Sequence, residues 1–513
     1  MRRLSLLLLL INVFSLFGIE YTVKQDGSGD YTTIQSAVNS AQSGDGILVY
    51  PGTYYENIII NEKNIDLYSL KHTTDDDSYI YQTTINGQDS LSCISIVHNC
   101  NVLIDGFSIT NGNGWGSGFS DDYDYQGGGI KIDFDNQVEV NNCRIFSNQA
   151  MTGGGIFTRG YLTISNNSIF NNRGLSGGGI FIDNYGEADM NMSSTNRNSI
   201  YNNKAGNGLD IMYYAPSSNY TNTMSVYLDT FSVAEPDNYF ITYQISNLSY
   251  THNHNPFTII DIEHGYRELI NQDFYVSPQG DDNNSGLTPD DPLLSIYKAF
   301  TSIKSDSLNP KTVYLAEGEY SNIDGGEQIF PIPLKKHVNF QGANRENTVI
   351  YNESNYTGLK SNLFYENSTI SNFTLTSITH NSSGFMLFTY KDVTVDNIIF
   401  ENSVARVFTG FATIPSDYDF TIRNCIIRNN IATEYAAGLT IYYGNDLLIE
   451  SCIIENNYSY LNEWCNNTCN GIYLLGGENL LMRKCIVRDN YVTYPMDWGM
   501  LGISGSLRYS QEH

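Results

Sequence analysis

Short segments of similar sequence recur along this chain, and the repetition restricts its fold more than any other feature. The tetrapeptide GGGI begins at Gly127, Gly153 and Gly177, so its copies start 26 and 24 residues apart. A second element lies between them, with the sequences VNNCRIFSN in residues 140–148 and ISNNSIFNN in residues 164–172. Related copies begin at residues 395, 422, 449 and 482. Ordered repeats of this length indicate a solenoid, in which each unit packs only against its neighbours.

The repeated segments have the pattern of β-strands. Apolar and polar residues alternate within each copy, and Asn or Gly residues bound it. A helical solenoid is excluded because the repeats lack an apolar stripe of helical period and because Gly triplets destabilise helices. The Leu spacing of leucine-rich repeats is also absent. Since parallel crossovers are almost always right-handed, the sequence predicts an all-β chain built from right-handed parallel β-helices.

Two residue types recur at fixed positions of the repeat. Asn occupies a turn position where left-handed backbone is tolerated and where amides of successive coils can form a ladder: Asn142, Asn166 and Asn424. Four cysteines share another position: Cys143, Cys425, Cys452 and Cys485. We interpret them as an inward column of small apolar side chains rather than as a metal site. Cys465 and Cys469 could form a local disulfide, with a zinc pair as the alternative.

The two halves of the chain begin alike. Residues 21–60 and 274–323 each contain a strand, an acidic Gly-rich loop, a short amphipathic helix, another strand and a G-x-Y turn. A helix there would cover the open end of a coil. We predict a first β-helix with its N-terminal cap in residues 19–208, a β-rich connector in 209–271 and a second capped β-helix in 272–513. The last segment resembles the start of a further coil, so a truncated C-terminus is an open alternative.

The N-terminus and the net charge bear on location and partners. Arg2 and Arg3 precede an apolar run over residues 4–17, which predicts a signal peptide over residues 1–18. A membrane anchor would need about 20 apolar residues. We therefore expect a secreted or cell-surface protein with no membrane span in its mature part. The formal net charge of −28 argues against binding to nucleic acid and against unaided binding to polyuronates.

Two segments resemble known families. The sequences DGSGDYTTIQSAV and PGTYYENI, in residues 26–38 and 51–58, resemble the N-terminal part of pectinesterases and other pectin-lyase-like β-helix proteins. Residues 275–299 resemble the caps of exported bacterial β-helix proteins, including some polysaccharide lyases. The GGGI repeats are similar to those of repetitive surface β-helix proteins and, less closely, of polymorphic outer-membrane adhesins. The resemblance covers most of the mature chain and implies the fold, whereas such folds carry many activities.

The sequence gives weaker signals for catalysis. The motifs that surround the paired Asp residues of pectinesterases are not found, and Asp133 and Asp135, placed outward on one strand, are more simply solvated carboxylates. A β-elimination lyase would need Ca²⁺ and a Lys or Arg base. Lys131 and Arg144 lie near the first long loop and are interpreted as surface residues. Ca²⁺ is the one cofactor that the sequence suggests, with these candidate ligands: Asp121, Asp122, Asp124, Asp281 and Asp282.

Aromatic residues in expanded loops form the candidate binding site. The three Trp residues each follow the same repeat element, and Tyr residues lie beside the first: Trp115, Trp464, Trp498, Tyr123 and Tyr125. Aromatic rings on a rigid coil can stack on sugar faces. The alternative is that these loops fold back and bury their rings. We therefore expect a non-catalytic protein that binds carbohydrate or another surface. A Ca²⁺-assisted polysaccharide lyase, or another pectin-type enzyme such as a glycoside hydrolase, and a structural or adhesive rod are the alternatives.

Overall fold

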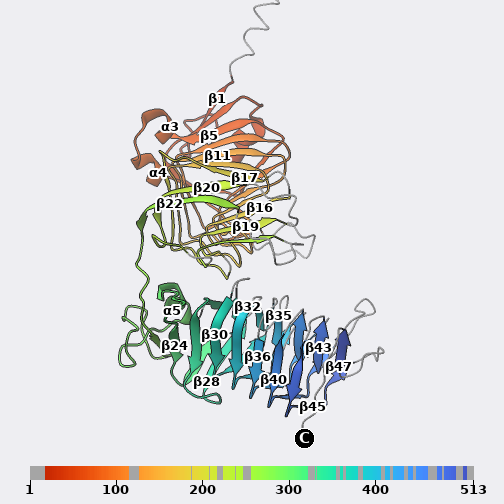
Figure 1. The fold of residues 1–513 in the computed structure, drawn as a ribbon. Coiled ribbons are helices and arrows are strands. Elements are labelled where there is room, and N and C mark those ends of the chain that lie inside the picture. Colours follow the sequence, from red (N-terminus) through yellow and green to blue (C-terminus); the bar gives the residue numbers. More distant parts are fainter. Residues whose placement is uncertain are drawn as a thin grey trace, which may run out of the picture. The chain divides into compact units, whose positions relative to one another are not determined.

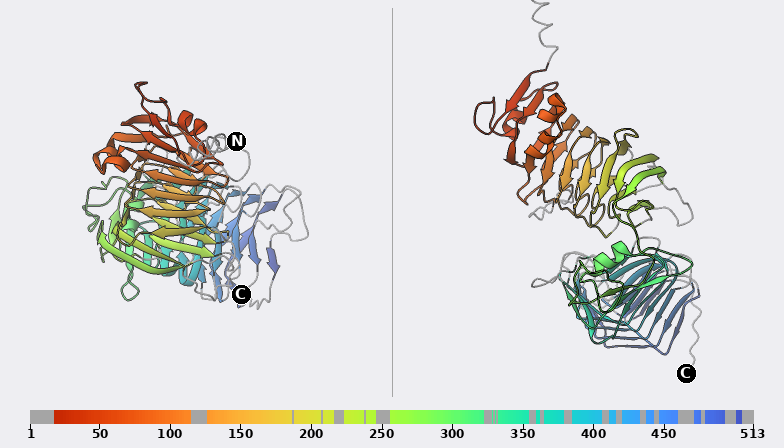
Figure 2. Two further views of the ribbon diagram at one scale, coloured as in Figure 1. Left: turned by 90° about the horizontal axis from the view of Figure 1, so that it is seen from above. Right: turned by 90° about the vertical axis from the view of Figure 1, so that its left-hand side faces the viewer.

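The computed structural model divides the chain into two compact units, Met1–Arg267 and Glu268–His513 (Figures 1 and 2). The structure describes residues 18–114, 126–185, 188–206, 208–215, 223–236, 239–245, 256–321, 328, 330, 332–353, 359–361, 365–378, 385–405, 411–415, 420–432, 437–442, 446–459, 471–475, 479–492 and 501–504.

Three parallel sheets, here named A, B and C, build the first unit. Sheet A contains β1 (Glu20–Val23), β2 (Gly46–Val49), β5 (Ile65–Ser69), β8 (Asn101–Asp105), β11 (Gln137–Asn141), β14 (Tyr161–Ser165) and β17 (Asp189–Met192). Sheet B contains β3 (Gly52–Tyr55), β6 (Thr83–Asn86), β9 (Ser108–Thr110), β12 (Arg144–Phe146), β15 (Ser168–Phe170), β18 (Asn198–Tyr201), β20 (Met224–Phe231) and β22 (Phe257–Gly265). Sheet C contains β4 (Ile58–Asn61), β7 (Ile94–Val97), β10 (Ile130–Ile132), β13 (Ile156–Thr158), β16 (Ile180–Asp183), β19 (Ile211–Ala215) and β21 (Ile241–Ile245).

The second unit has two larger parallel sheets, D and E. Sheet D contains β23 (Phe274–Val276), β24 (Lys311–Leu315), β26 (Ile332–Leu334), β27 (Val338–Gly342), β29 (Leu359–Ser361), β30 (Tyr365–Ser371), β32 (Phe385–Asp396), β35 (Phe411–Pro415), β36 (Phe420–Arg423), β39 (Leu439–Tyr442), β40 (Leu447–Glu450), β43 (Ile472–Leu475), β44 (Leu481–Arg483) and β47 (Leu501–Ser504). Sheet E contains β25 (Gly318–Ser321), β28 (Thr348–Glu353), β31 (Thr374–Ile378), β33 (Ile399–Glu401), β34 (Val404–Ala405), β37 (Ile426–Arg428), β38 (Ile431–Ala432), β41 (Ile453–Glu455), β42 (Tyr458–Ser459), β45 (Ile486–Arg488) and β46 (Tyr491–Val492).

Each repeat of the sequence supplies strands to each sheet of its unit, and the strands of one repeat are here called a rung. Residues of successive repeats face one another in register, so inward apolar side chains form columns. One column in sheet B includes five fully buried residues: Ile85, Ile109, Ile145, Ile169 and Ile200. The strands of segment 209–271, expected as a connector, pair in parallel with strands of the first unit. The parallel β-helix predicted from the repeats is therefore confirmed.

Short helices interrupt the strands. The helix α2 (Ile34–Ser40) buries Ile34, Ala37 and Val38 and contacts β1, β2 and β4, and Thr33 caps its N-terminus. The helix α5 (Ile296–Ser302) contacts β23, β24 and β26 in the second unit. Two further helices, α3 (Leu70–Thr74) and α4 (Ser78–Gln82), lie between β5 and β6.

The repeated polar residues occupy the positions that the sequence predicts. Asn142, Asn166 and Asn424 have φ values of 51°, 52° and 56°, in the left-handed region, and Asn166 Nδ2 donates to Asn142 Oδ1 at 2.7 Å. Cys425 and Cys452 are buried at equivalent positions of adjacent rungs, whereas Cys485 is partly exposed. Cys143 is buried in the first unit. Cys465 and Cys469 lie outside the described residues.

One expectation about the acidic residues is wrong. Strand β10 ends at Ile132, and Asp135 has a φ of 59° in the turn that follows. Asp133 and Asp135 therefore do not share a strand, because both lie in the turn between β10 and β11.

A buried polar ladder runs inside the first unit. The backbone N–H and the Nδ2 group of each Asn donate to the side-chain oxygen of the next residue in the series Asn148, Asn172, Asn203 and Asp210. Asp210 is fully buried. Burial raises its pKa to about 6, although hydrogen bonds from Asn203 and Ser232 and the charge of Arg267 act in the opposite direction.

Asp210 should make the first unit less stable at neutral pH than at pH 4. The folded state holds the proton up to about pH 6, whereas the unfolded chain releases it near pH 4. The contribution of Asp210 to the unfolding free energy therefore falls as the pH rises from about 4 to about 6, and it stays low at higher pH. We expect Asp210→Asn to raise the unfolding free energy by about 2–3 kcal/mol at pH 7.5 and to change it little at pH 4. Urea denaturation at both pH values checks this; an equal effect at the two would contradict it.

Candidate functional site

The exterior face of sheet B carries side chains that the strand alternation turns away from the core. In β12, Ile145 points inward, so Arg144 and Phe146 lie on the exterior. The register places Phe146, Phe170 and Tyr201 beside one another on successive rungs. One repeat position therefore produces a column of aromatic rings along the coil.

Four rings stack on one another here, with β20 lying between β18, which contains Tyr201, and β22, which ends next to Tyr266. The ring centroids are 5.2 Å apart for Phe146 and Phe170, 5.4 Å for Phe170 and Tyr201, and 4.7 Å for Tyr201 and Tyr266, with interplanar angles of 6°, 8° and 21°. Phe146, Phe170, Tyr201 and Tyr266 are here called the aromatic column. Tyr266 is 54% exposed and the other three rings are half-buried. Burial raises the pKa of Tyr201, and Tyr266 adds to the shift while Arg144 opposes it, so its hydroxyl stays protonated as a donor.

Arg144 lies over one end of the aromatic column. Its guanidinium carbon is 4.8 Å from the ring centroid of Phe146 and 4.5 Å from that of Tyr81, which lies in helix α4 and is 63% exposed. Nη1 donates to Ser108 Oγ at 3.4 Å. No carboxylate of the described residues forms an ion pair with Arg144. Its charge is therefore available to a ligand.

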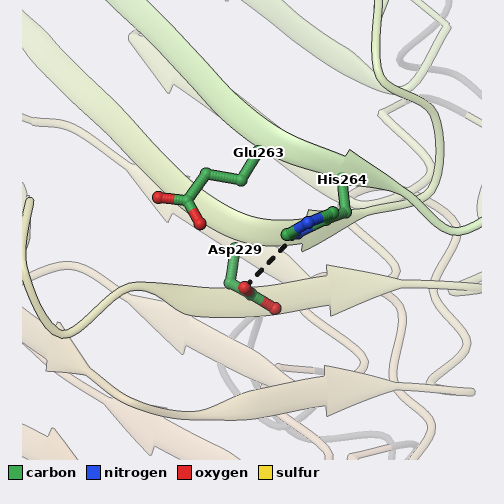
Figure 3. A group of neighbouring side chains, drawn as sticks. All are labelled: Asp229, Glu263 and His264. Atoms are coloured by element: carbon green, nitrogen blue, oxygen red, sulfur yellow. Dashed lines mark ion pairs between the residues drawn. The ribbon is translucent and has the colours of Figure 1, made fainter.

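Charged side chains lie toward the other end of sheet B, on β20 and β22 (Figure 3). His264 Nδ1 is 3.5 Å from Asp229 Oδ1, and ligand atoms of Asp229, Glu263 and His264 all lie within 4.8 Å of one another. Arg197 pairs with Asp261 at 2.8 Å and with Glu263 at 3.0 Å. The Arg197 guanidinium lowers the pKa of Asp261. The face thus offers rings, an arginine and a carboxylate–imidazole cluster along one sheet.

The exterior of the second unit differs in character. Acidic and basic residues alternate on successive rungs in two columns: Asp396, Arg423, Glu450 and Arg483 in sheet D, and Glu401, Arg428, Glu455 and Arg488 in sheet E. Arg423 pairs with Asp396 at 2.9 Å and Arg428 pairs with Glu401 at 2.6 Å. These charges satisfy one another, so the columns are better suited to holding rungs in register than to binding a ligand.

Most of the site residues expected from sequence fall on segments that the structure does not describe. This applies to five aromatic and three acidic residues: Trp115, Tyr123, Tyr125, Trp464, Trp498, Asp121, Asp122 and Asp124. Asp281 and Asp282 lie in the described part of the chain, and their carboxylates accept hydrogen bonds from backbone N–H groups of the same loop region. Asp281 Oδ1 accepts from the backbone N–H of Asn283, and Asp282 Oδ1 accepts those of Leu294 and Ser295. They stay proposed Ca²⁺ ligands, with some of their oxygens already engaged.

The aromatic column was missed in the sequence although a signal for it exists. The segments RIFSN, SIFNN and SIYNN place an aromatic residue at one repeat position, at Phe146, Phe170 and Tyr201. In a parallel coil, a residue type that recurs at the same strand position of each repeat predicts a continuous surface better than isolated residues in long loops do.

The comparisons with known proteins agree with the fold. Residues 336–499 match the family model described as right handed beta helix region, and residues 278–358 match a family described as a protein of unknown function. No curated protein matches the chain significantly. In the part of the chain that the structure describes, no helix is long and apolar enough to cross a membrane.

Two solved structures are similar to the chain at low identity. The pectin methylesterase from Aspergillus niger in deglycosylated form is 16% identical, with 48% of this chain and 85% of that chain covered and a TM-score of 0.23. The PL6 family alginate lyase AlyGC is 11% identical, with 96% and 100% covered and a TM-score of 0.25. The parallel pairing of the strands shows a parallel β-helix fold in both units, and residues 336–499 match the family of right-handed β-helix regions.

Proposed function

We propose that this is an exported β-helix protein that binds carbohydrate through the exterior face of sheet B in its first unit. The observation that carries the proposal is the aromatic column with Arg144 over its end. Sugar rings have apolar faces that pack on aromatic rings, and their hydroxyl groups need polar partners beside those rings. A regular column on a rigid sheet suits a ligand that itself repeats.

The charges of the face favour a particular class of glycan. Arg144 can donate to hydroxyl or carboxylate oxygens because it has no carboxylate partner among the described residues. The net charge of −28, however, repels polyanions at low salt. We therefore propose neutral glycans as the principal ligands, with acidic glycans bound where cations reduce the repulsion. The loop residues Trp115 in the first unit and Trp464 and Trp498 in the second remain further proposed contact residues.

Removing rings of the aromatic column should weaken glycan binding. We expect Tyr201→Ala combined with Tyr266→Ala to lower the affinity for the best ligand of a glycan array about tenfold, or about 1.4 kcal/mol, because stacked area is lost. Isothermal titration calorimetry measures the change. The control is Tyr161→Ala, which removes a ring that is 46% exposed on sheet A.

Three outcomes would decide between the proposals. Unchanged affinity in the double variant, with its fold intact by circular dichroism, would refute binding at the aromatic column. If Trp115→Ala abolished binding instead, the loop surface would be the site. Incubation with pectin, alginate and neutral glycans, with and without Ca²⁺, tests the lyase alternative. New unsaturated ends that absorb in the ultraviolet would show catalysis in place of binding alone.

A further inference from the structure

The register of β20 and β22 brings two carboxylates together. Leu228 pairs with Ile262 and Thr230 pairs with His264, so Asp229 lies directly opposite Glu263. Like charges at opposed positions of neighbouring strands are destabilising. Arg197 offsets part of this charge through Glu263 and Asp261, and among the described residues it forms no ion pair with Asp229. A further cation beside Asp229 would relieve the remaining repulsion.

The side chain of Asp229 is already oriented by its neighbours. Its Oδ2 accepts from Thr230 Oγ1 at 2.8 Å and from Ser199 Oγ at 3.4 Å, so Oδ1 is directed to His264 Nδ1. Hydroxyl groups that bond to a carboxylate in this way fix metal ligands in other proteins. The cluster therefore contains one held ligand and two exposed ones, Glu263 and His264.

The distance between Asp229 and His264 fits a bridging ion better than a direct bond. Their atoms are 3.5 Å apart, beyond the usual range of an N–H···O hydrogen bond. Two ligand atoms on a tetrahedral Zn²⁺, each about 2.0–2.1 Å from the metal, are about 3.3–3.4 Å apart. A small closure of the two side chains would give that geometry, and Glu263 is within reach as the third ligand.

We propose that Asp229, Glu263 and His264 bind a divalent transition-metal ion such as Zn²⁺ on the exterior of sheet B. The imidazole nitrogen favours this class of ion over Ca²⁺, which prefers oxygen ligands throughout. Three protein ligands leave a coordination position for water or a sugar hydroxyl. That last consequence rests on the proposed function, because it needs a glycan on the same face, whereas the metal site does not.

Metal titration of the full chain tests the site without any glycan. After removal of bound metal with chelator, we expect Zn²⁺ to bind more tightly than Ca²⁺ by calorimetry. We expect His264→Gln and Asp229→Asn each to weaken Zn²⁺ binding at least tenfold. Co²⁺ provides a second readout, because visible absorption bands of the bound ion should vanish in His264→Gln.

The control variant separates coordination from a general effect of charge. Glu235→Gln removes an exposed carboxylate outside the cluster, and we expect at most a twofold change in Zn²⁺ affinity. Equal Zn²⁺ affinity in the wild type and His264→Gln would overturn the proposal. So would an equal loss in Glu235→Gln and Asp229→Asn. Failure of either metal test leaves the glycan experiments with Tyr201 and Tyr266 unaffected, so the two proposals fail separately.

Discussion

Replacing Asn172 with Leu should lower the unfolding free energy of the first unit by about 3–5 kcal/mol. The Oδ1 atom of Asn172 accepts from the backbone N–H and Nδ2 of Asn148 at 3.1 and 3.0 Å. Its Nδ2 donates to Ile145 O at 2.8 Å and Asn203 Oδ1 at 3.1 Å. Leu would leave the buried N–H of Asn148 without its acceptor and would remove the Asn172 donor from Ile145 O, each at a cost of about 1–3 kcal/mol. Nδ2 of Asn148 would keep its bond to Ile109 O, and Oδ1 of Asn203 would keep the bond from the backbone N–H of residue 172.

Chemical denaturation of the purified chain measures this effect. The matched control is Thr163→Leu, which adds the same side chain at an exposed position of β14, and we expect it to change the free energy by no more than about 0.5 kcal/mol. Equal effects of the two changes would show that the Asn ladder does not stabilise the coil.

The second large effect is expected at the GGGI repeats. A Cβ atom on Gly154 would lie 2.4 Å from Arg173 O and 2.7 Å from Gly178 O, on the backbone of the next rung. Because backbone atoms on paired strands cannot move alone, Gly154→Ala should destabilise the first unit by about 2–4 kcal/mol. The melting temperature and the unfolding free energy measure the loss.

A different glycine provides the control for this prediction. Gly27 has a φ of 80° and no atom within 4 Å of the Cβ position. Asn tolerates left-handed backbone, so Gly27→Asn should cost no more than about 1 kcal/mol. If Gly154→Ala were as mild as this control, the rungs would not approach one another as closely as the structure has them.

The sequence predicts the rungs well because their spacing depends on local patterns. Alternation of apolar and polar residues within a short strand determines which side chains face inward. Because the strands pair in parallel and in register, the equivalent residues of every coil then have the same orientation. This is why Cys425 and Cys452, and the left-handed turns at Asn142 and Asn166, could be placed from spacing alone.

The candidate site could not be assembled in the same way. Tyr81 meets Arg144 because helix α4 is inserted between β5 and β6, and no repeat specifies where an insertion packs. The cluster of Asp229 and His264 depends on β20 and β22, which lie in the segment where the repeat is lost. The register of β18 and β20 also shifts between Asn198 and Ile200. Such shifts change which side chains meet, and they leave no periodic signal.

Hydroxyl-radical footprinting with and without a bound glycan tests the binding face most directly. We predict that the ligand protects Tyr81 and Tyr266, the exposed rings at the two ends of the aromatic column, and that Tyr161 on sheet A stays as reactive as it is without ligand. Protection confined to Trp115 and residues near it, or equal protection of Tyr161 and Tyr266, would contradict binding on the exterior of sheet B.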